Sequence, residues 1–134
     1  MYRFTKLLLI SLAIVSLLAC SRVQPIREIH QPVPLANYSG DFHQILLQAL
    51  AHGNWVVEQD RPQQILARID FRGHSASITL NYSATRYDIL YRDSEKLRYA
   101  DGKIHKRYNA LVKRLHGLTQ HYMKLSINPE PSSS

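Results

Sequence analysis

The feature that most limits the fold is an alternation of apolar and polar residues across residues 65–91. The apolar positions are Ile65, Ala67, Ile69, Phe71, Ala76, Ile78, Leu80, Tyr82, Tyr87, Ile89 and Tyr91. A period of two is typical of a β-strand that has one buried and one solvated face. The turns between the runs, at residues 73–74 and 83–85, are so short that they connect only antiparallel neighbours. The stretch therefore predicts three antiparallel strands with one apolar side.

A fourth strand precedes these three. Residues 55–58 also alternate, with Trp55 and Val57 on one side, and a turn at residues 60–63 follows in which Pro62 sets the backbone φ angle. We therefore expect a four-stranded antiparallel meander. A sheet with one apolar face needs a second layer to cover it.

The first covering helix is predicted directly before the strands. Asp41 is a good N-cap residue, and Gly53 is a good residue for the C-terminal end. Between them, apolar residues recur at steps of three and four, which marks one face of a helix. These residues are Phe42, Ile45, Leu46, Ala49 and Leu50.

The second covering helix is predicted from the most regular pattern in the chain. Steps of four and three residues alternate, which is typical of a long amphipathic helix. The positions are Ile104, Tyr108, Leu111, Leu115, Leu118, Tyr122 and Leu125. A turn at residues 101–102 precedes the pattern, and Pro129 follows it.

These patterns predict an α+β domain over residues 41–126, followed by a disordered tail over residues 127–134. The expected architecture has two layers. One layer is the four-stranded antiparallel meander, and the other holds both helices on one face of it. The order of elements along the chain is α-β-β-β-β-α.

The first 19 residues read as an export signal. Arg3 and Lys6 form a positive start, and residues 7–18 are apolar apart from Ser11 and Ser16. This run of about a dozen residues is shorter than the roughly 20 apolar residues that a membrane span needs. We therefore expect a secretory signal peptide over residues 1–19.

Cys20 is the single cysteine of the chain, so it has no partner for an internal disulfide. The sequence Leu17-Leu18-Ala19-Cys20 resembles the lipobox of bacterial lipoproteins. The resemblance implies a diacylglycerol on the Cys20 sulfur, cleavage between Ala19 and Cys20, and an N-acyl chain such as palmitate on the new amine. It implies no other cofactor. Ser21, in place of Asp, resembles the outer-membrane sorting signal of Gram-negative lipoproteins, with the domain facing the periplasm.

Residues 20–40 are expected to form an extended tether. Pro25, Pro32 and Pro34 interrupt this segment and disfavour a helix. Twenty extended residues reach at most about 60–70 Å, which lets the domain act away from its anchor. A short strand between Arg27 and Gln31 that joins the sheet edge is an open alternative.

The charge balance points to acidic partners. Removing Arg3 and Lys6 from the 17 basic residues leaves 15 against 10 acidic residues, a net charge of +5 with histidine neutral. Outside the cytoplasm, this favours anionic lipid, cell-wall glycan or an acidic protein face over nucleic acid. The candidate face is Lys103, Lys106, Arg107, Lys113 and Arg114. The alternative is an ordinary solvated helix face that keeps the domain soluble.

No motif for catalysis or for a metal appears in the sequence. The histidines show no metal-ligand spacing, and no nucleophile elbow or phosphate-binding loop occurs. Asp70 and Asp88 fall on the wet face of the sheet, where ion pairs between strands are the ordinary explanation. We therefore expect neither catalytic residues nor a metal site. Half of the six tyrosines between residues 82 and 122 fall at positions predicted to face the core, and we expect core residues whose hydroxyls reach the rim.

The segments 91–99 and 104–109 loosely resemble the C-terminal part of small uncharacterised proteobacterial lipoproteins. That resemblance implies an envelope location and an architecture, with His105, Tyr108 and Asn109 as the residues of interest. Helix-start packing and capping are the structural alternative for these three.

Three functions follow in order of preference. The first is a non-catalytic binding or accessory subunit in an envelope protein complex, anchored to the membrane by lipid. The second is a module that binds anionic lipid or glycan through the basic helix face. The third is an envelope hydrolase with an unrecognised site.

Overall fold

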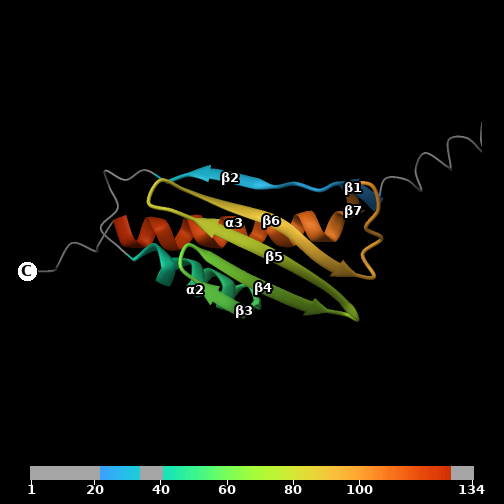
Figure 1. Cartoon of the computed structure of the whole chain (residues 1–134), viewed down its shortest axis with the longest axis horizontal. Coiled ribbons are helices and arrows are strands. Elements are labelled where there is room, and N and C mark those ends of the chain that lie inside the picture. The colour runs from blue at the N-terminus through green and yellow to red at the C-terminus, as the bar shows by residue number, and fades with distance from the viewer. Residues whose placement is uncertain (1–21, 34–40, 128–134) are drawn as a thin grey trace, which may run out of the picture.

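The computed structural model describes residues 22–33 and 41–127, which form an α+β domain (Figure 1). The strands are β1 (Val23–Pro25), β2 (Ile29–Pro32), β3 (Val56–Arg61), β4 (Gln64–Phe71), β5 (His74–Tyr82), β6 (Arg86–Glu95) and β7 (Lys103–His105). The helices are α2 (Phe42–His52) and α3 (Lys106–Ile127). Five strands form an antiparallel sheet in the order β2-β6-β5-β4-β3, and β1 and β7 form a separate two-stranded sheet. The predicted fold class is confirmed.

The predicted meander is present as β3, β4, β5 and β6, but the sheet has five strands and not four. The fifth strand, β2, pairs with β6 at the edge, with Ile29 opposite Ile89 and Pro32 opposite Arg86. The predicted order of elements is therefore incomplete, because it lacks β1, β2 and β7. Strands β1 and β7 have three residues each and are too short to show a period in the sequence, so only their pairing reveals them.

The segment predicted as a free tether is largely part of the domain. β1 pairs with β7, β2 pairs with β6, and Val33 is buried in the core. The prediction of an extended linker is therefore wrong for residues 22–33. The alternative of a short strand that joins the sheet edge is confirmed, because β2 overlaps the range Arg27–Gln31 and pairs with β6. Pro25 and Pro32 are compatible with this role because each lies at the end of a short strand, where proline is tolerated. The predicted signal peptide, Cys20, residues 34–40 and the tail beyond residue 127 lie outside the described residues.

Helix α2 has the predicted ends. The Asp41 side chain accepts a hydrogen bond from the His43 backbone N–H at 3.1 Å, and the Gly53 N–H donates to the Ala49 carbonyl at 3.0 Å. These bonds satisfy backbone groups that a helix end otherwise leaves unpaired. A Cβ atom at residue 53 would lie 3.0 Å from Trp55 Cδ1, which is a second reason for glycine there.

Helix α3 begins two residues later than its pattern predicts, because Ile104 lies in β7. The prediction for Leu125 is also wrong, since that residue is 57% exposed. A strict spacing of 3.5 residues drifts by about 20° per heptad on a helix of 3.6 residues per turn. The late positions therefore rotate away from the core. The fully buried stripe is Tyr108, Val112, Leu115, Thr119 and Met123.

Both helices cover the same face of the sheet. The Tyr87 ring, on β6, lies 5.5 Å from the Phe42 ring of α2 and 5.8 Å from the His116 ring of α3. Figure 1 shows both helices behind the strands, and no described helix lies in front of them. The opposite face, called here the open face, is left to solvent. In the described part of the chain, no helix is both long and apolar enough to cross a membrane.

One tight turn differs from its prediction by one residue. The β4–β5 connection is Arg72-Gly73, with φ angles of 48° and 78°, and His74 already pairs with Phe71. Positive φ at both central residues matches the right-handed twist of a two-residue hairpin. Gly73 supplies this conformation without strain.

Candidate functional site

Three of the five predicted cations lie together in one depression of about 470 Å³ at the start of α3. We call it the basic cleft. Lys106, Arg107 and Lys113 line it, whereas Lys103 and Arg114 are exposed outside it. The sequence prediction missed Arg27, which lies 86 positions before Lys113 in the chain. The full lining is Gln24, Arg27, His105, Lys106, Arg107, Asn109, Ala110 and Lys113.

Asn109 holds the cleft together. Its Nδ2 donates to the Gln24 Oε1 at 3.2 Å and to the Pro25 carbonyl at 3.0 Å. Its Oδ1 accepts from the Arg27 backbone N–H at 3.0 Å. This buried amide therefore fastens the N-terminal segment to the first turns of α3 and positions Arg27 beside the helix cations. The structural alternative for Asn109, packing at the helix start, is what the geometry shows.

His105 caps the start of α3 and lines the cleft. Its imidazole Nδ1 accepts a hydrogen bond from the Arg107 backbone N–H at 3.2 Å, and the backbone N–H of His105 donates to the Leu97 carbonyl at 2.8 Å. The first turn of α3 contains no acidic residue. The positive end of the helix dipole therefore adds to the positive charge of the cleft.

The pKa of the His105 imidazole lies below its ordinary value of 6.5. Partial burial is the main cause, and the positive charges of Arg107, Arg98 and Lys106 act in the same direction. The ring is therefore neutral at pH 7. An anion held in the cleft would offset these charges and raise the pKa of His105.

The cations of the cleft have no acidic partner. None of Arg27, Lys106, Arg107 and Lys113 forms an ion pair with any residue of the described ranges 22–33 and 41–127. The lining contains no aspartate or glutamate. The cleft is therefore suited to anionic groups, and the planar guanidinium of each of its two arginines can donate to two oxygens of a phosphate or carboxylate.

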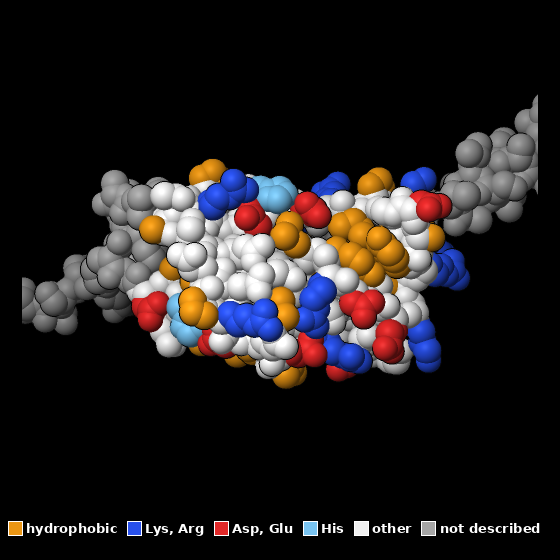
Figure 2. All heavy atoms as spheres, in the orientation of Figure 1, with side chains coloured by type: hydrophobic (Ala, Val, Ile, Leu, Met, Phe, Trp, Pro, Cys, Tyr) orange, Lys and Arg blue, Asp and Glu red, His pale blue; other side chains and the backbone are white. Residues whose placement is uncertain are grey.

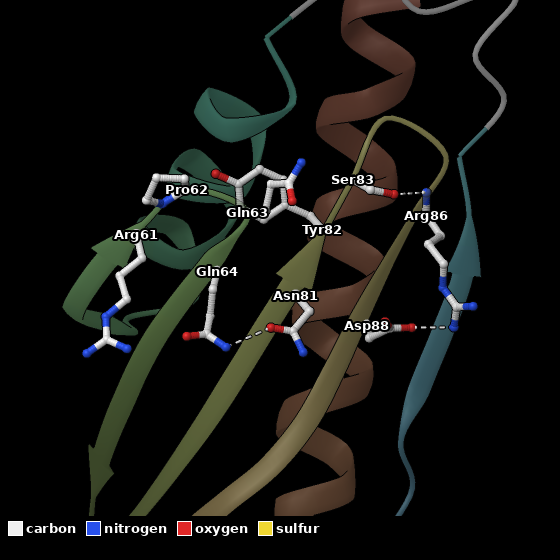
Figure 3. Close-up of a pocket in the computed structure, with 9 residues that line it drawn as sticks. All are labelled: Arg61, Pro62, Gln63, Gln64, Asn81, Tyr82, Ser83, Arg86 and Asp88. Carbon is white, nitrogen blue, oxygen red and sulfur yellow. Dashed lines mark hydrogen bonds and ion pairs between the residues drawn. The ribbon is translucent and has the colours of Figure 1, made fainter.

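A second depression, also of about 470 Å³, lies on the open face near the ends of β4 and β5 (Figure 3). Its polar groups bond to one another. Gln64 Nε2 donates to Asn81 Oδ1 at 3.0 Å, and Arg86 forms an ion pair with Asp88 at 2.7 Å. The remaining lining is Arg61, Pro62, Gln63, Tyr82 and Ser83.

Pairing of opposite charges continues across the open face, where Figure 2 shows acidic and basic side chains interspersed. Asp88 also accepts from His30 at 2.8 Å across the strands β2 and β6. Burial raises the pKa of Asp88, but hydrogen bonds from Arg86 and His30 outweigh it, and the net pKa lies below the usual value. Asp70 pairs with Arg68 of its own strand at 3.0 Å, not across strands as the sequence suggested.

Two histidine–carboxylate pairs bear on the hydrolase hypothesis. His30 bonds to Asp88, and His43 lies 2.8 Å from Asp60, which are the pairs a general base would need. In the described part of the chain, neither imidazole hydrogen-bonds to a hydroxyl or thiol that would act as a nucleophile. The same ranges contain no group of three His, Cys, Asp or Glu residues that could hold a metal ion.

The buried tyrosines belong to the core. The Tyr87 hydroxyl lies 2.7 Å from His116 Nδ1 and accepts from Gln120 Nε2 at 2.9 Å, and burial raises its pKa to about 12. The Tyr108 hydroxyl is also buried, which raises its pKa, and it has no hydrogen-bond partner among the described residues. Neither hydroxyl lines the cleft, so neither belongs to the candidate site.

Comparison with protein-family models and with curated proteins found no match to the chain.

Proposed function

We propose that this protein is a lipid-anchored, non-catalytic binding protein of the cell envelope that takes an anionic ligand in the basic cleft. The observation that carries the proposal is the contrast in charge pairing. Four cations converge in the cleft without an acidic neighbour in its lining, while the acids of the open face are largely paired.

The anchor in this proposal is the lipid on Cys20, within the lipobox-like sequence at residues 17–20. A single acyl chain gives only marginal attachment, whereas two or more chains hold a protein firmly on a membrane. In a Gram-negative cell, Ser21 favours the outer membrane, with the domain in the periplasm. No cofactor is part of the proposal.

The chemistry of the cleft selects phosphate or carboxylate groups. Arg27 and Arg107 supply planar guanidinium donors, and Lys106 and Lys113 supply compact positive charges. Anionic lipid, anionic glycan and an acidic face of a protein partner all carry suitable groups. The last of these corresponds to an accessory subunit in an envelope complex. An envelope hydrolase is the least favoured reading.

The proposal is tested by reversing the charge of the predicted cations. A variant with Lys106, Arg107, Lys113 and Arg114 replaced by glutamate should lose cosedimentation with anionic vesicles and with cell-wall glycan. A matched control makes the same change to glutamate at Arg61, Arg72, Lys96 and Lys124. These four residues are exposed, lie outside the cleft and form no ion pair with the described residues. Binding that is unchanged by the first variant and insensitive to salt would contradict the proposal.

A further inference from the structure

The N-terminal end of the described chain lies beside the basic cleft. β1 pairs with β7 so that Val23 is opposite His105, and Gln24 and His105 both line the cleft. Figure 1 shows β1, β7 and the start of α3 together at one end of the molecule. The turn at residues 83–85 lies at the other end. The exposed Arg22, which precedes β1, therefore adds a further positive charge at the end that holds the cleft.

The distance from this end to the predicted lipid is short. Cys20 is two residues before Arg22, and two residues span at most about 7 Å. This reach is comparable to the Debye length of about 8–10 Å at ordinary salt concentration. A lipid on Cys20 therefore brings the bilayer surface within electrostatic range of this end of the domain.

We infer that the anionic ligand of the basic cleft is the phosphate of phospholipid headgroups in the same bilayer that holds the Cys20 lipid. The inference rests on the proposed function and names the ligand of the same site. The lipid and the cleft then contact one membrane together and fix the orientation of the domain. Arg22, Arg27, Lys106, Arg107 and Lys113 face the headgroups, and the turn at residues 83–85 is at the distal end.

The short link between Cys20 and Arg22 favours headgroups over other anions. A ligand that shares a short tether with its site is present at a high effective concentration, whereas a glycan or a protein partner must be bound from solution. Each basic residue near an anionic membrane surface strengthens attachment about fivefold. The unpaired charge of the cleft is thus placed where a neighbouring anionic surface is always available.

The test uses the mature lipidated protein in vesicles. One fluorophore is attached through Ala100→Cys, which lies beside β7 and outside the cleft lining, or through Ala84→Cys in the distal turn, while the lipid blocks the Cys20 thiol. Both alanines are exposed. Lipids with a quencher on the headgroup report proximity. Vesicles of phosphatidylcholine alone are compared with vesicles that also contain phosphatidylglycerol.

We expect quenching at residue 100 to exceed quenching at residue 84 and to rise when phosphatidylglycerol is present. Replacing Arg27, Lys106, Arg107 and Lys113 by glutamine should abolish this rise, as should high salt. The matched control removes the same amount of charge elsewhere on the domain, by replacing Arg61, Arg72, Lys96 and Lys124 with glutamine. This control should preserve the rise in quenching.

Two results would overturn the inference in distinguishable ways. If quenching at residue 100 does not respond to phosphatidylglycerol, while an anionic glycan still binds the cleft, the headgroup inference fails and the proposed function stands. If mass spectrometry finds an unmodified Cys20 thiol, the anchor itself is absent, and the proposed function fails together with the inference.

Discussion

The open face of the sheet and the basic cleft contain the same kinds of basic side chain but differ in the partners beside them. On the open face, Asp88 accepts bonds from both Arg86 and His30. In the cleft, Arg27 and Arg107 have no acidic partner among the described residues. Arg68, Arg86 and Arg92 are therefore paired with acids on the open face, whereas the four cations of the cleft have no acidic partner among the described residues. The number of basic residues in a segment does not by itself locate an anion site.

The pKa values of two histidines reflect this difference. The hydrogen bond to Asp88 raises the pKa of His30 above 6.5, with a further contribution from Glu28. Burial lowers the pKa of His105 below 6.5, and the charges of Arg107 and Arg98 act in the same direction. The same side chain thus has opposite pKa shifts, because an acidic hydrogen-bond partner dominates at His30, whereas burial dominates at His105 and positive neighbours act in the same direction.

The largest expected effect comes from removing the amide that builds the cleft. Asn109→Ala deletes three hydrogen bonds and leaves the Arg27 N–H and the Pro25 carbonyl without their partner. We expect a loss of about 2–3 kcal/mol in the free energy of unfolding, measured by urea denaturation, and weaker anion binding. Asn109→Asp keeps the acceptor for the Arg27 N–H but loses the donor to Gln24 Oε1 and to the Pro25 carbonyl, so it separates the first bond from the other two. Unchanged stability in the alanine variant would show that the N-terminal segment is not fastened by Asn109.

The next prediction compares one charge from each region. Asp88→Asn removes the partner of Arg86 and should lower stability by about 0.5–1 kcal/mol. Arg107→Gln removes a cation from the first turn of α3 and should raise stability by about 0.3–0.5 kcal/mol, because it opposes the helix dipole. If thermal and urea unfolding showed that both variants change the free energy of unfolding in the same direction, the contrast between the two regions would be contradicted.

The smallest effects are those of pH. Because the folded pKa of His30 is raised, its contribution to stability is present below pH 6.5 and is lost as pH rises through the folded value. Because the folded pKa of His105 is lowered, its contribution is complete above pH 6.5 and is lost as pH falls through the folded value. NMR titration of the imidazole rings measures both values.

Two substitutions serve as controls for this titration. Asp88→Asn should lower the pKa of His30, and Arg107→Gln should raise the pKa of His105. If the two rings titrated with the same pKa in the unaltered protein, the opposite influence of their neighbours would be contradicted.

Local sequence patterns were sufficient to predict the longer helices and strands. The alternation at Ile65 and Ile78, the cap at Asp41 and the end at Gly53 all appear where the sequence predicts them. Helix α3 was predicted with its buried stripe slightly misplaced. Thr119 was missed because it is polar, although it is buried with its hydroxyl bonded to the Leu115 carbonyl at 2.9 Å.

The candidate site was only half predictable. Lys106, Arg107 and Lys113 were identified because they share one helix, where spacing shows which side chains are neighbours. Arg27 was missed because its segment is short and was assigned to a tether. No local signal joins it to Asn109, which lies 82 positions away.

The sequence by itself determined the α+β class, the four strands of the meander, the two helices and the positive charge near the start of α3. Each of these depends on residues close together in the chain, where periodicity and capping act. Only the tertiary structure decided that residues 22–33 belong to the domain and that Arg27 completes the basic cleft. Those features depend on pairing between β1 and β7, which arises from the packing of the whole chain.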